Sequence, residues 1–213
     1  MREELYQQLL QRESEWLEQE GWMDERRWIE EGIDLQRQLI NECPGEVRHK
    51  TQLAKLLLQH GRNEKIKYGN RTKALPLFQE ALEMNPEDPY PHYHIGYIHF
   101  LDNRWEEAVD HFTVFLRRPR LPVVYRVRAL CASAISHHML GNEEKARCLL
   151  EEASSADKEG IHSTEIELAL IHLERPVRHY PFMLINSEGE KRSISREEAE
   201  ILSEEVGTDG FLL

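Results

Sequence analysis

The feature that most constrains this chain is a recurring stripe of small and aromatic residues. The stretch ALPLFQEALEMNP, residues 74–86, places Ala74, Phe78 and Ala81 on one side of a helix and ends at Asn-Pro. A shift of 34 residues brings this stripe onto Ala108, Phe112 and Phe115. A period of this length indicates stacked helix hairpins that share a continuous core.

Further copies of the stripe occur on both sides. A step of 38 residues leads to Ala146, Leu150 and Ala153, with Gly141 ending the helix before them. In the other direction, the 42 residues from Pro44 to Pro86 equal one period plus an insertion, which we place at 62–73. The sequence before Pro44 then predicts a degenerate N-terminal helix hairpin.

Each stripe needs a preceding helix against which it can pack. The stretch EVRHKTQLAKLLLQHG, residues 46–61, has Leu53, Ala54 and Leu57 at helical spacing, and Gly61 is predicted to be its C-cap. In the next copy, Gly96 falls inside the corresponding helix, where a close helix crossing requires a small residue. We therefore predict that Gly96 and the alanines of the stripe are buried.

These residues resemble the tetratricopeptide repeat (TPR) family, which has small residues at positions eight and twenty-seven, Ala at twenty, an aromatic at twenty-four and Pro at thirty-two. The copy at 89–119 matches at Gly96, Ala108 and Phe112 but departs at Phe115 and Arg120. The resemblance covers about residues 3–160. It implies an all-α solenoid of stacked antiparallel helix hairpins, a TPR-like superhelix.

The predicted organisation has three parts. Residues 1–45 form the degenerate hairpin, and residues 46–160 form TPR-like repeats at about 46–87, 88–122 and 123–160. Residues 161–213 form a capping helix, a β-hairpin and a C-terminal helix. The β-hairpin is predicted from YPFMLIN, SEGE and KRSIS, and the last helix from a capping box at Ser195 and Glu198 with a stop at Gly207.

Two interpretations of this C-terminal segment are open. The hairpin and helix pack as a cap on the last repeat, which the ends of solenoids require. Alternatively, they form a docking element. A hairpin followed by a helix also resembles the beginning of winged-helix regulator domains, but a recognition helix and a wing would have to follow.

Charge and composition limit the possible partners. The formal net charge is −12, which opposes nucleic-acid binding because phosphate contacts require an electropositive face. The longest uncharged run is too short for a membrane span, and the charged start MREELYQQLLQR is unlike a signal peptide, so we expect a cytoplasmic protein. Three cysteines without CxxC spacing predict neither disulfides nor a zinc site.

The resemblance implies which residues line the concave surface. Family geometry turns positions two, five, nine and twelve of each first helix inward, and the candidates for partner binding there are Arg48, Lys55, Tyr90, Tyr93, Tyr97, Phe100, Arg128 and His138. This order of basic, aromatic and basic residues suits a protein or peptide with acidic and apolar side chains. The other interpretation of the tyrosines is that they pack on neighbouring helices.

No pattern in the chain predicts catalysis. GxSxG, HExxH and phosphate-binding glycine loops are absent, and the clustered His92, His94 and His99 lack the spacing of helical metal ligands. We therefore predict no catalytic residue, no metal and no cofactor. The predicted function is a non-catalytic scaffold or adaptor for protein–protein interaction. The alternative is a transcription-related regulatory protein whose C-terminal hairpin and helix dock a partner or nucleic acid.

Overall fold

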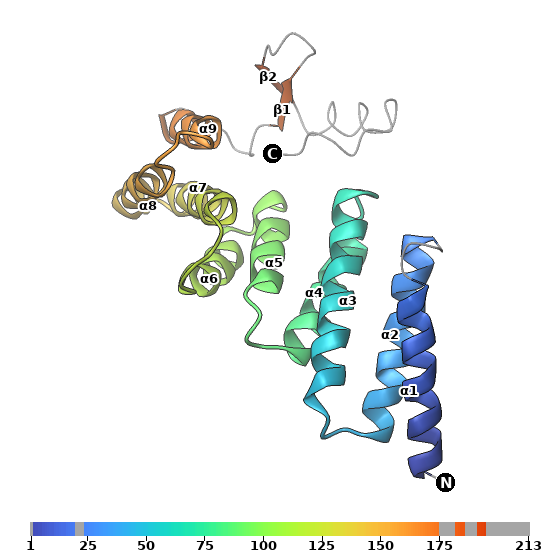
Figure 1. The fold of residues 1–213 in the computed structure, drawn as a ribbon. Helices are drawn as coiled ribbons and strands as arrows, with labels where there is room; N and C mark the ends of the chain where they lie inside the picture. Colours follow the sequence, from blue (N-terminus) through green and yellow to red (C-terminus); the bar gives the residue numbers. More distant parts are fainter. Residues whose placement is uncertain (1, 20–23, 175–181, 186–190, 195–213) are drawn as a thin grey trace. The chain divides into compact units, whose positions relative to one another are not determined.

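The computed structural model describes residues 1–213 except 1, 20–23, 175–181, 186–190 and 195–213 (Figure 1). Its helices are α1 (Arg2–Glu18), α2 (Glu25–Glu42), α3 (Val47–Ile66), α4 (Arg71–Met84), α5 (Tyr90–Leu101), α6 (Trp105–Leu116), α7 (Val123–Met139), α8 (Glu143–Ala156) and α9 (Ser163–Glu174). The chain divides into two compact units, residues 1–94 and 95–213, and we describe each by itself. The predicted fold of repeated helix hairpins is confirmed at this level.

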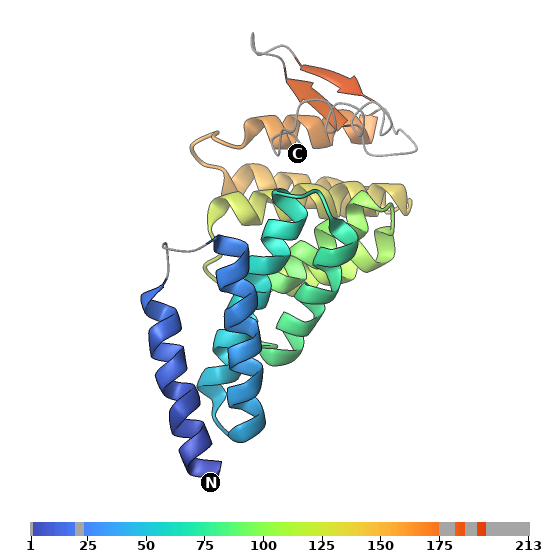
Figure 2. The same ribbon diagram turned by 90° about the vertical axis from the view of Figure 1, so that its right-hand side faces the viewer.

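The first unit stacks its helices in chain order. Helix α1 packs on α2, α2 on α3 and α3 on α4, and Figures 1 and 2 both show these neighbours side by side. One core runs through the stack because each helix supplies apolar residues to the next. Its largest fully buried members include Ile29, Leu39, Leu53 and Leu57.

The first hairpin is joined by a pair of tryptophans. The rings of Trp16 and Trp28 stack with centroids 4.4 Å apart, and each indole N–H donates to the backbone carbonyl of the other residue. Gly32 on α2 makes room for this pair. A Cβ built on Gly32 would lie 2.2 Å from Cζ2 of Trp16, so no larger residue fits without a shift.

The second hairpin corrects two predictions. Gly61 is not a helix C-cap, because α3 continues to Ile66 and a Cβ on Gly61 would lie 2.6 Å from Cε1 of Phe78. The residues 62–73 are therefore not a loop insertion. They extend α3 and begin α4, whose first turn is capped by the Asn70 side chain accepting from the Lys73 amide. The additional residues lengthen the helices.

The second unit repeats the same contact. A Cβ on Gly96 would lie 3.0 Å from Cε1 of Phe112, which confirms the predicted close crossing of α5 and α6. The predicted stripe positions Ala108, Phe112, Phe115, Ala146, Leu150 and Ala153 are all buried. The middle of helix α7, from Ala129 to Ser136, is buried because α6, α8 and α9 all pack on α7 (Figure 2).

Near the C-terminus the structure describes two short strands. β1 (Phe182–Ile185) and β2 (Lys191–Ile194) are antiparallel, with Phe182 opposite Ile194 and Ile185 opposite Lys191. The helix predicted to begin at Ser195 lies outside the described residues. Among the helices that are described, none combines the length and the apolar composition needed to cross a bilayer.

Candidate partner-binding surface

The eight predicted partner-binding residues are divided equally between the two units. Arg48, Lys55, Tyr90 and Tyr93 belong to the first unit, and Tyr97, Phe100, Arg128 and His138 belong to the second. The four aromatic residues follow one another on α5 at spacings of three and four residues, which places them on one face of that helix.

In the first unit the two predicted cations differ in their surroundings. Lys55 is exposed on α3. Arg48 is also exposed, but its guanidinium donates to Oε2 of Glu13 on α1 at 2.6 Å. The Arg48 cation is thus already matched by an acid of the same unit.

Glu13 belongs to a buried polar network that joins three helices. Gln36 of α2 donates through Nε2 to Oε1 of Glu13 at 2.6 Å, which directs the Gln36 amide oxygen toward Nδ1 of His49 at 3.0 Å. An amide oxygen only accepts, so Nδ1 of His49 carries the proton and Nε2 accepts from the Tyr6 hydroxyl, also at 3.0 Å. Burial lowers the pKa of His49, and neighbouring Glu13 raises it in part. The neutral ring therefore fits this network.

The tyrosines of the first unit are covered to different extents. Tyr90 is half-buried, whereas Tyr93 is only 6% exposed and meets the ring of His94 edge-on. His94 in turn stacks on Phe78 with centroids 4.8 Å apart. Burial, followed by the nearby Lys65 and Arg62, holds the pKa of His94 well below its usual value. Tyr93 is therefore placed as a packing residue.

In the second unit, Tyr97 and Phe100 show the same contrast. Phe100 is 2% exposed and meets Tyr97 and Trp105 edge-on. Tyr97 is half-buried, rests edge-on against Phe112, and donates its hydroxyl hydrogen to the backbone carbonyl of Arg128 at 3.2 Å. The ring of Tyr97 is thus fixed at both ends while part of it faces solvent.

The residue that accepts this hydrogen bond, Arg128, is also the predicted cation of α7. Arg128 donates through Nε and Nη2 to Oε1 of Glu165 on α9, at 3.4 and 3.3 Å, and its side chain is 39% exposed. Next to it on α7, Cys131 is buried, and burial followed by the charge of Glu165 raises the pKa of its thiol to about 12. Helix α9 therefore covers part of the face that the sequence assigns to a partner.

His138, near the C-terminal end of α7, contacts Glu143 and His172. Its Nδ1 lies 2.8 Å from Oε1 of Glu143, and its ring meets His172 of α9 edge-on at 6.4 Å. Burial, followed by the neighbouring His138, lowers the pKa of His172 to about 4. This end of the second unit therefore holds a neutral His172 at physiological pH.

The basic stretch 62–73 takes part in both helices of the second hairpin. Arg62 and Lys65 lie in the last turns of α3, and Arg71 and Lys73 in the first turn of α4. Burial, followed by the charge of Arg71, lowers the pKa of Lys65 to about 7. Lys67 pairs with Glu25 of α2. Lys65 and Lys67 therefore lie among residues of the first unit, and the sequence hypothesis that the basic stretch 62–73 touches an acidic partner stays a prediction.

Two acids next to the candidate residues were not found from the sequence. Glu13 and Glu165 are spread among many glutamates on helix faces, for which a solvated role is the default. Their positions beside Arg48 and Arg128 depend on how α1 and α9 pack, and no spacing rule connects residues so far apart in the chain. No signal in the sequence could have found them.

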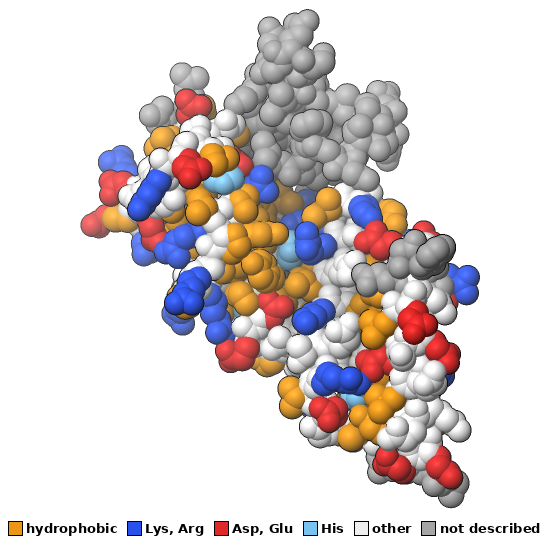
Figure 3. Space-filling model, viewed as in Figure 1, with side chains coloured by type: hydrophobic (Ala, Val, Ile, Leu, Met, Phe, Trp, Pro, Cys, Tyr) orange, Lys and Arg blue, Asp and Glu red, His pale blue; other side chains and the backbone are white. Residues whose placement is uncertain are grey.

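The surface around these residues carries both charges. Over α1–α3, acidic and basic side chains are interspersed, and over α6–α8 basic and hydrophobic side chains lie side by side (Figure 3). Among the described residues, no three His, Cys, Asp or Glu side chains are gathered to hold a metal ion. The predictions of no metal and no catalysis stay predictions.

Comparison with known proteins leaves the family open. No protein-family model matches the chain, and no curated protein matches it. A solved structure titled "MamA MSR-1 C2" is similar over 62% of this chain and 69% of that chain, at 22% identity and a TM-score of 0.39. A TM-score of 0.39 does not establish a shared fold, so the TPR resemblance rests on the repeated residues of this chain.

Proposed function

We propose that this chain is a non-catalytic scaffold that binds a protein or peptide through a surface containing Tyr97 and Arg128. The observation that carries the proposal is the arrangement of these two side chains. The half-buried ring of Tyr97 is fixed by a hydrogen bond to the backbone carbonyl of Arg128, and the side chain of Arg128 is itself 39% exposed. Fixed aromatic and arginine side chains are the residue types that dominate interface energetics.

The chemistry of this pair favours an acidic and apolar ligand. The Tyr97 ring offers contact area at low entropic cost because its position is already fixed, and Arg128 attracts a carboxylate. Glu165 competes for that guanidinium through long hydrogen bonds of 3.3 and 3.4 Å. A partner carboxylate that displaces or shares this contact gives the surface its specificity.

We further propose that the four helix hairpins are TPR-like repeats. Hairpins α3–α4, α5–α6 and α7–α8 correspond to the predicted repeats at 46–87, 88–122 and 123–160, and α1–α2 corresponds to the degenerate hairpin at 1–45. The glycine–phenylalanine contact that α3–α4 shares with α5–α6 supports the repetition of the hairpin. It aligns Gly61 with Gly96, seven residues after Ala54, the residue that corresponds to Gly96 when Arg48 and Lys55 take positions two and nine.

A selection from a displayed peptide library, with the full chain as bait, tests the proposed ligand chemistry. The selected peptides are expected to be enriched in Asp and Glu next to apolar residues. Arg128→Ala and Tyr97→Ala are each expected to weaken binding of a selected peptide by about 2 kcal/mol, roughly thirtyfold. Arg117→Ala, an exposed cation after α6, is the control expected to bind normally. Selected peptides that bind both variants as tightly as the original chain would refute the proposal.

A further inference from the structure

Helix α9 carries exposed apolar side chains beside its buried side. Ile166, Ala169 and His172 are buried where α9 packs on α7 and α8. Leu170 and Ile171 are 46% and 53% exposed; Leu170 borders the side that faces α8, and Ile171 lies opposite the buried side. Adjacent exposed apolar side chains indicate a second packing surface.

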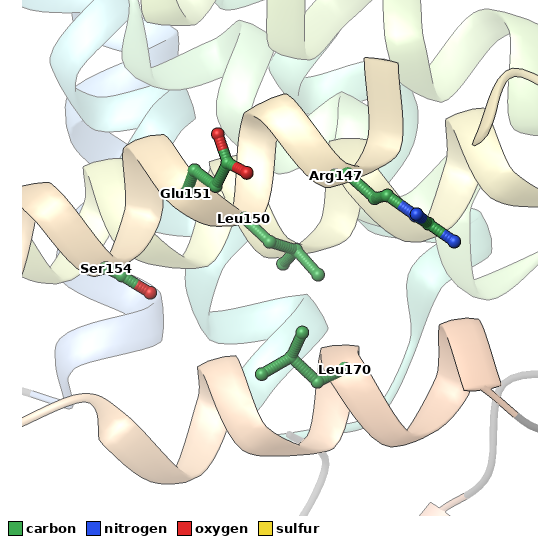
Figure 4. A pocket seen from close by; sticks show the side chains of 5 residues that line it. All are labelled: Arg147, Leu150, Glu151, Ser154 and Leu170. Atoms are coloured by element: carbon green, nitrogen blue, oxygen red, sulfur yellow. The ribbon is translucent and has the colours of Figure 1, made fainter. Parts of the chain in front are cut away.

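The apolar surface continues from α9 onto α8. In Figure 4 the side chains of Leu150 and Leu170 point toward each other across a shallow notch, whose rim carries Arg147, Glu151 and Ser154. The rim holds one charge of each sign. Apolar contact, more than charge, therefore determines what fits here.

The chain itself supplies apolar elements directly after α9. The strands β1 and β2 form a two-stranded pair, and a two-stranded hairpin alone is at best marginally stable in water. The following sequence SREEAEILSEEVG, residues 195–207, has Ala199, Leu202 and Val206 at positions that share one face of a helix. Both elements need an apolar surface on which to pack.

We propose that Ile171 of α9, together with the Leu150–Leu170 notch between α8 and α9, forms the docking surface for the chain's own residues 175–213. This docking surface is separate from the partner-binding surface, because Glu165, which pairs with Arg128, lies on a different side of α9 from Leu170 and Ile171. Own-chain docking is favoured over a second copy because a short tether gives an effective concentration of about a millimolar. A second copy reaches that level only in concentrated solution.

Hydrogen exchange of the full-length protein measures this docking. In the original chain, the amides of residues 195–207 are expected to be protected. The variant Leu170→Asp/Ile171→Asp is expected to raise their exchange rate about tenfold or more, because a docked segment exchanges through undocking. The amides of α7 are expected to stay protected, which shows that the unit remains folded.

A matched control and a second measurement separate the possible occupants. Val114→Asp changes a similarly exposed apolar residue of α6 and is expected to leave residues 195–207 protected. A photo-crosslinking amino acid at position 171 is expected to form adducts within the same chain, to residues 175–213. Crosslinks between two chains would identify a second copy and overturn the proposal. Unprotected amides at 195–207, or protection unchanged in the double variant, would overturn it as well.

Discussion

The two hairpins of the first unit solve the same packing problem with the residues exchanged. In α3–α4, the glycine is on the first helix and the large ring on the second, as Gly61 receives Phe78. In α1–α2, the ring is on the first helix and the glycine on the second, as Trp16 covers Gly32. In both hairpins a glycine on one helix makes room for an aromatic ring on the other. Either helix can carry the glycine, as long as the other carries the ring.

The exchange explains why the N-terminal hairpin has only a degenerate repeat pattern. A sequence repeat is recognised by the same residue types at the same positions. Gly96 and Phe112 occupy the repeat's glycine and aromatic positions, whereas Trp16 and Gly32 have the two residue types in the reverse order. The first hairpin also adds specific polar contacts, including the indole hydrogen bonds and the network through Glu13, Gln36 and His49. Such contacts depend on tertiary geometry and have no period.

Removing the large ring is expected to give the largest effect in both kinds of hairpin. Phe78→Ala, Phe112→Ala and Trp16→Ala each create a cavity, and each is expected to cost about 3 to 5 kcal/mol of stability. Thermal and chemical unfolding followed by circular dichroism measure this. A loss at Trp16 well below those at the phenylalanines would show that the exchanged arrangement contributes less to stability.

Acid is expected to weaken the second unit through His172. Its pKa of about 4 lies below the ordinary value of 6.5, so the unfolded state binds the proton more readily between these pH values. The stabilisation is present above pH 6.5 and is lost as the pH falls toward 4, by about 3 kcal/mol at most. His172→Leu, which removes the titrating group, is expected to flatten the pH dependence of hydrogen exchange in α9. If the pH dependence stayed equally steep in that variant, His172 would not be the group that destabilises the unit in acid.

His49 is expected to act in the same direction in the first unit. Burial lowers its pKa too, so acid is expected to destabilise the first unit as well.

Replacing each of the three glycines by alanine tests how closely the facing ring approaches. The measured quantity is the change in the free energy of unfolding. The distances from a new Cβ to the facing ring are 2.2, 2.6 and 3.0 Å at Gly32, Gly61 and Gly96. Gly32→Ala is expected to cost about 1 to 3 kcal/mol through overpacking, and Gly61→Ala less. At Gly96 the strain is nearly offset by the gain of about 0.5 to 1 kcal/mol from replacing glycine in a helix. Gly96→Leu is expected to cost about 1 to 3 kcal/mol or more.

Gly45 supplies the control for this series. Nothing lies within 4 Å of a Cβ built on Gly45, and it stands between α2 and α3. Gly45→Ala is therefore expected to change the unfolding midpoint little. An order of stabilities that does not follow the three distances would refute the proposed ring and gap contacts.

The smallest expected effect is a difference in the labelling rates of two thiols, which involves no change in stability. Cys148 is exposed on α8, whereas Cys131 is buried with a pKa of about 12. Because the thiolate is the reactive species, a thiol reagent at pH 8 is expected to label Cys148 within minutes and Cys131 only after unfolding. Mass spectrometry of the labelled peptides distinguishes the two sites. Rapid labelling of Cys131 in the folded protein would contradict the packing of α9 on α7.

By itself, the sequence determined the helix hairpins and the buried stripe through Ala74, Phe78, Ala108 and Phe112. These features are local, because helical spacing and the size of a side chain fix which face must be buried. The sequence also pointed to Gly96, since a glycine within an apolar helical pattern marks a close approach.

Only the tertiary structure decided the environment of the candidate site. The sequence predicts a helix end at Gly61, but a C-cap and a close helix crossing both favour glycine, and only the ring of Phe78 distinguishes the two. Tyr93 and Tyr97 have the same residue type and neighbouring positions on one face, yet Tyr93 is buried and Tyr97 is only half-buried. The acids beside Arg48 and Arg128 come from α1 and α9, distant in the chain. Burial and charge pairing arise from contacts between helices, and a periodic pattern within one helix does not contain them.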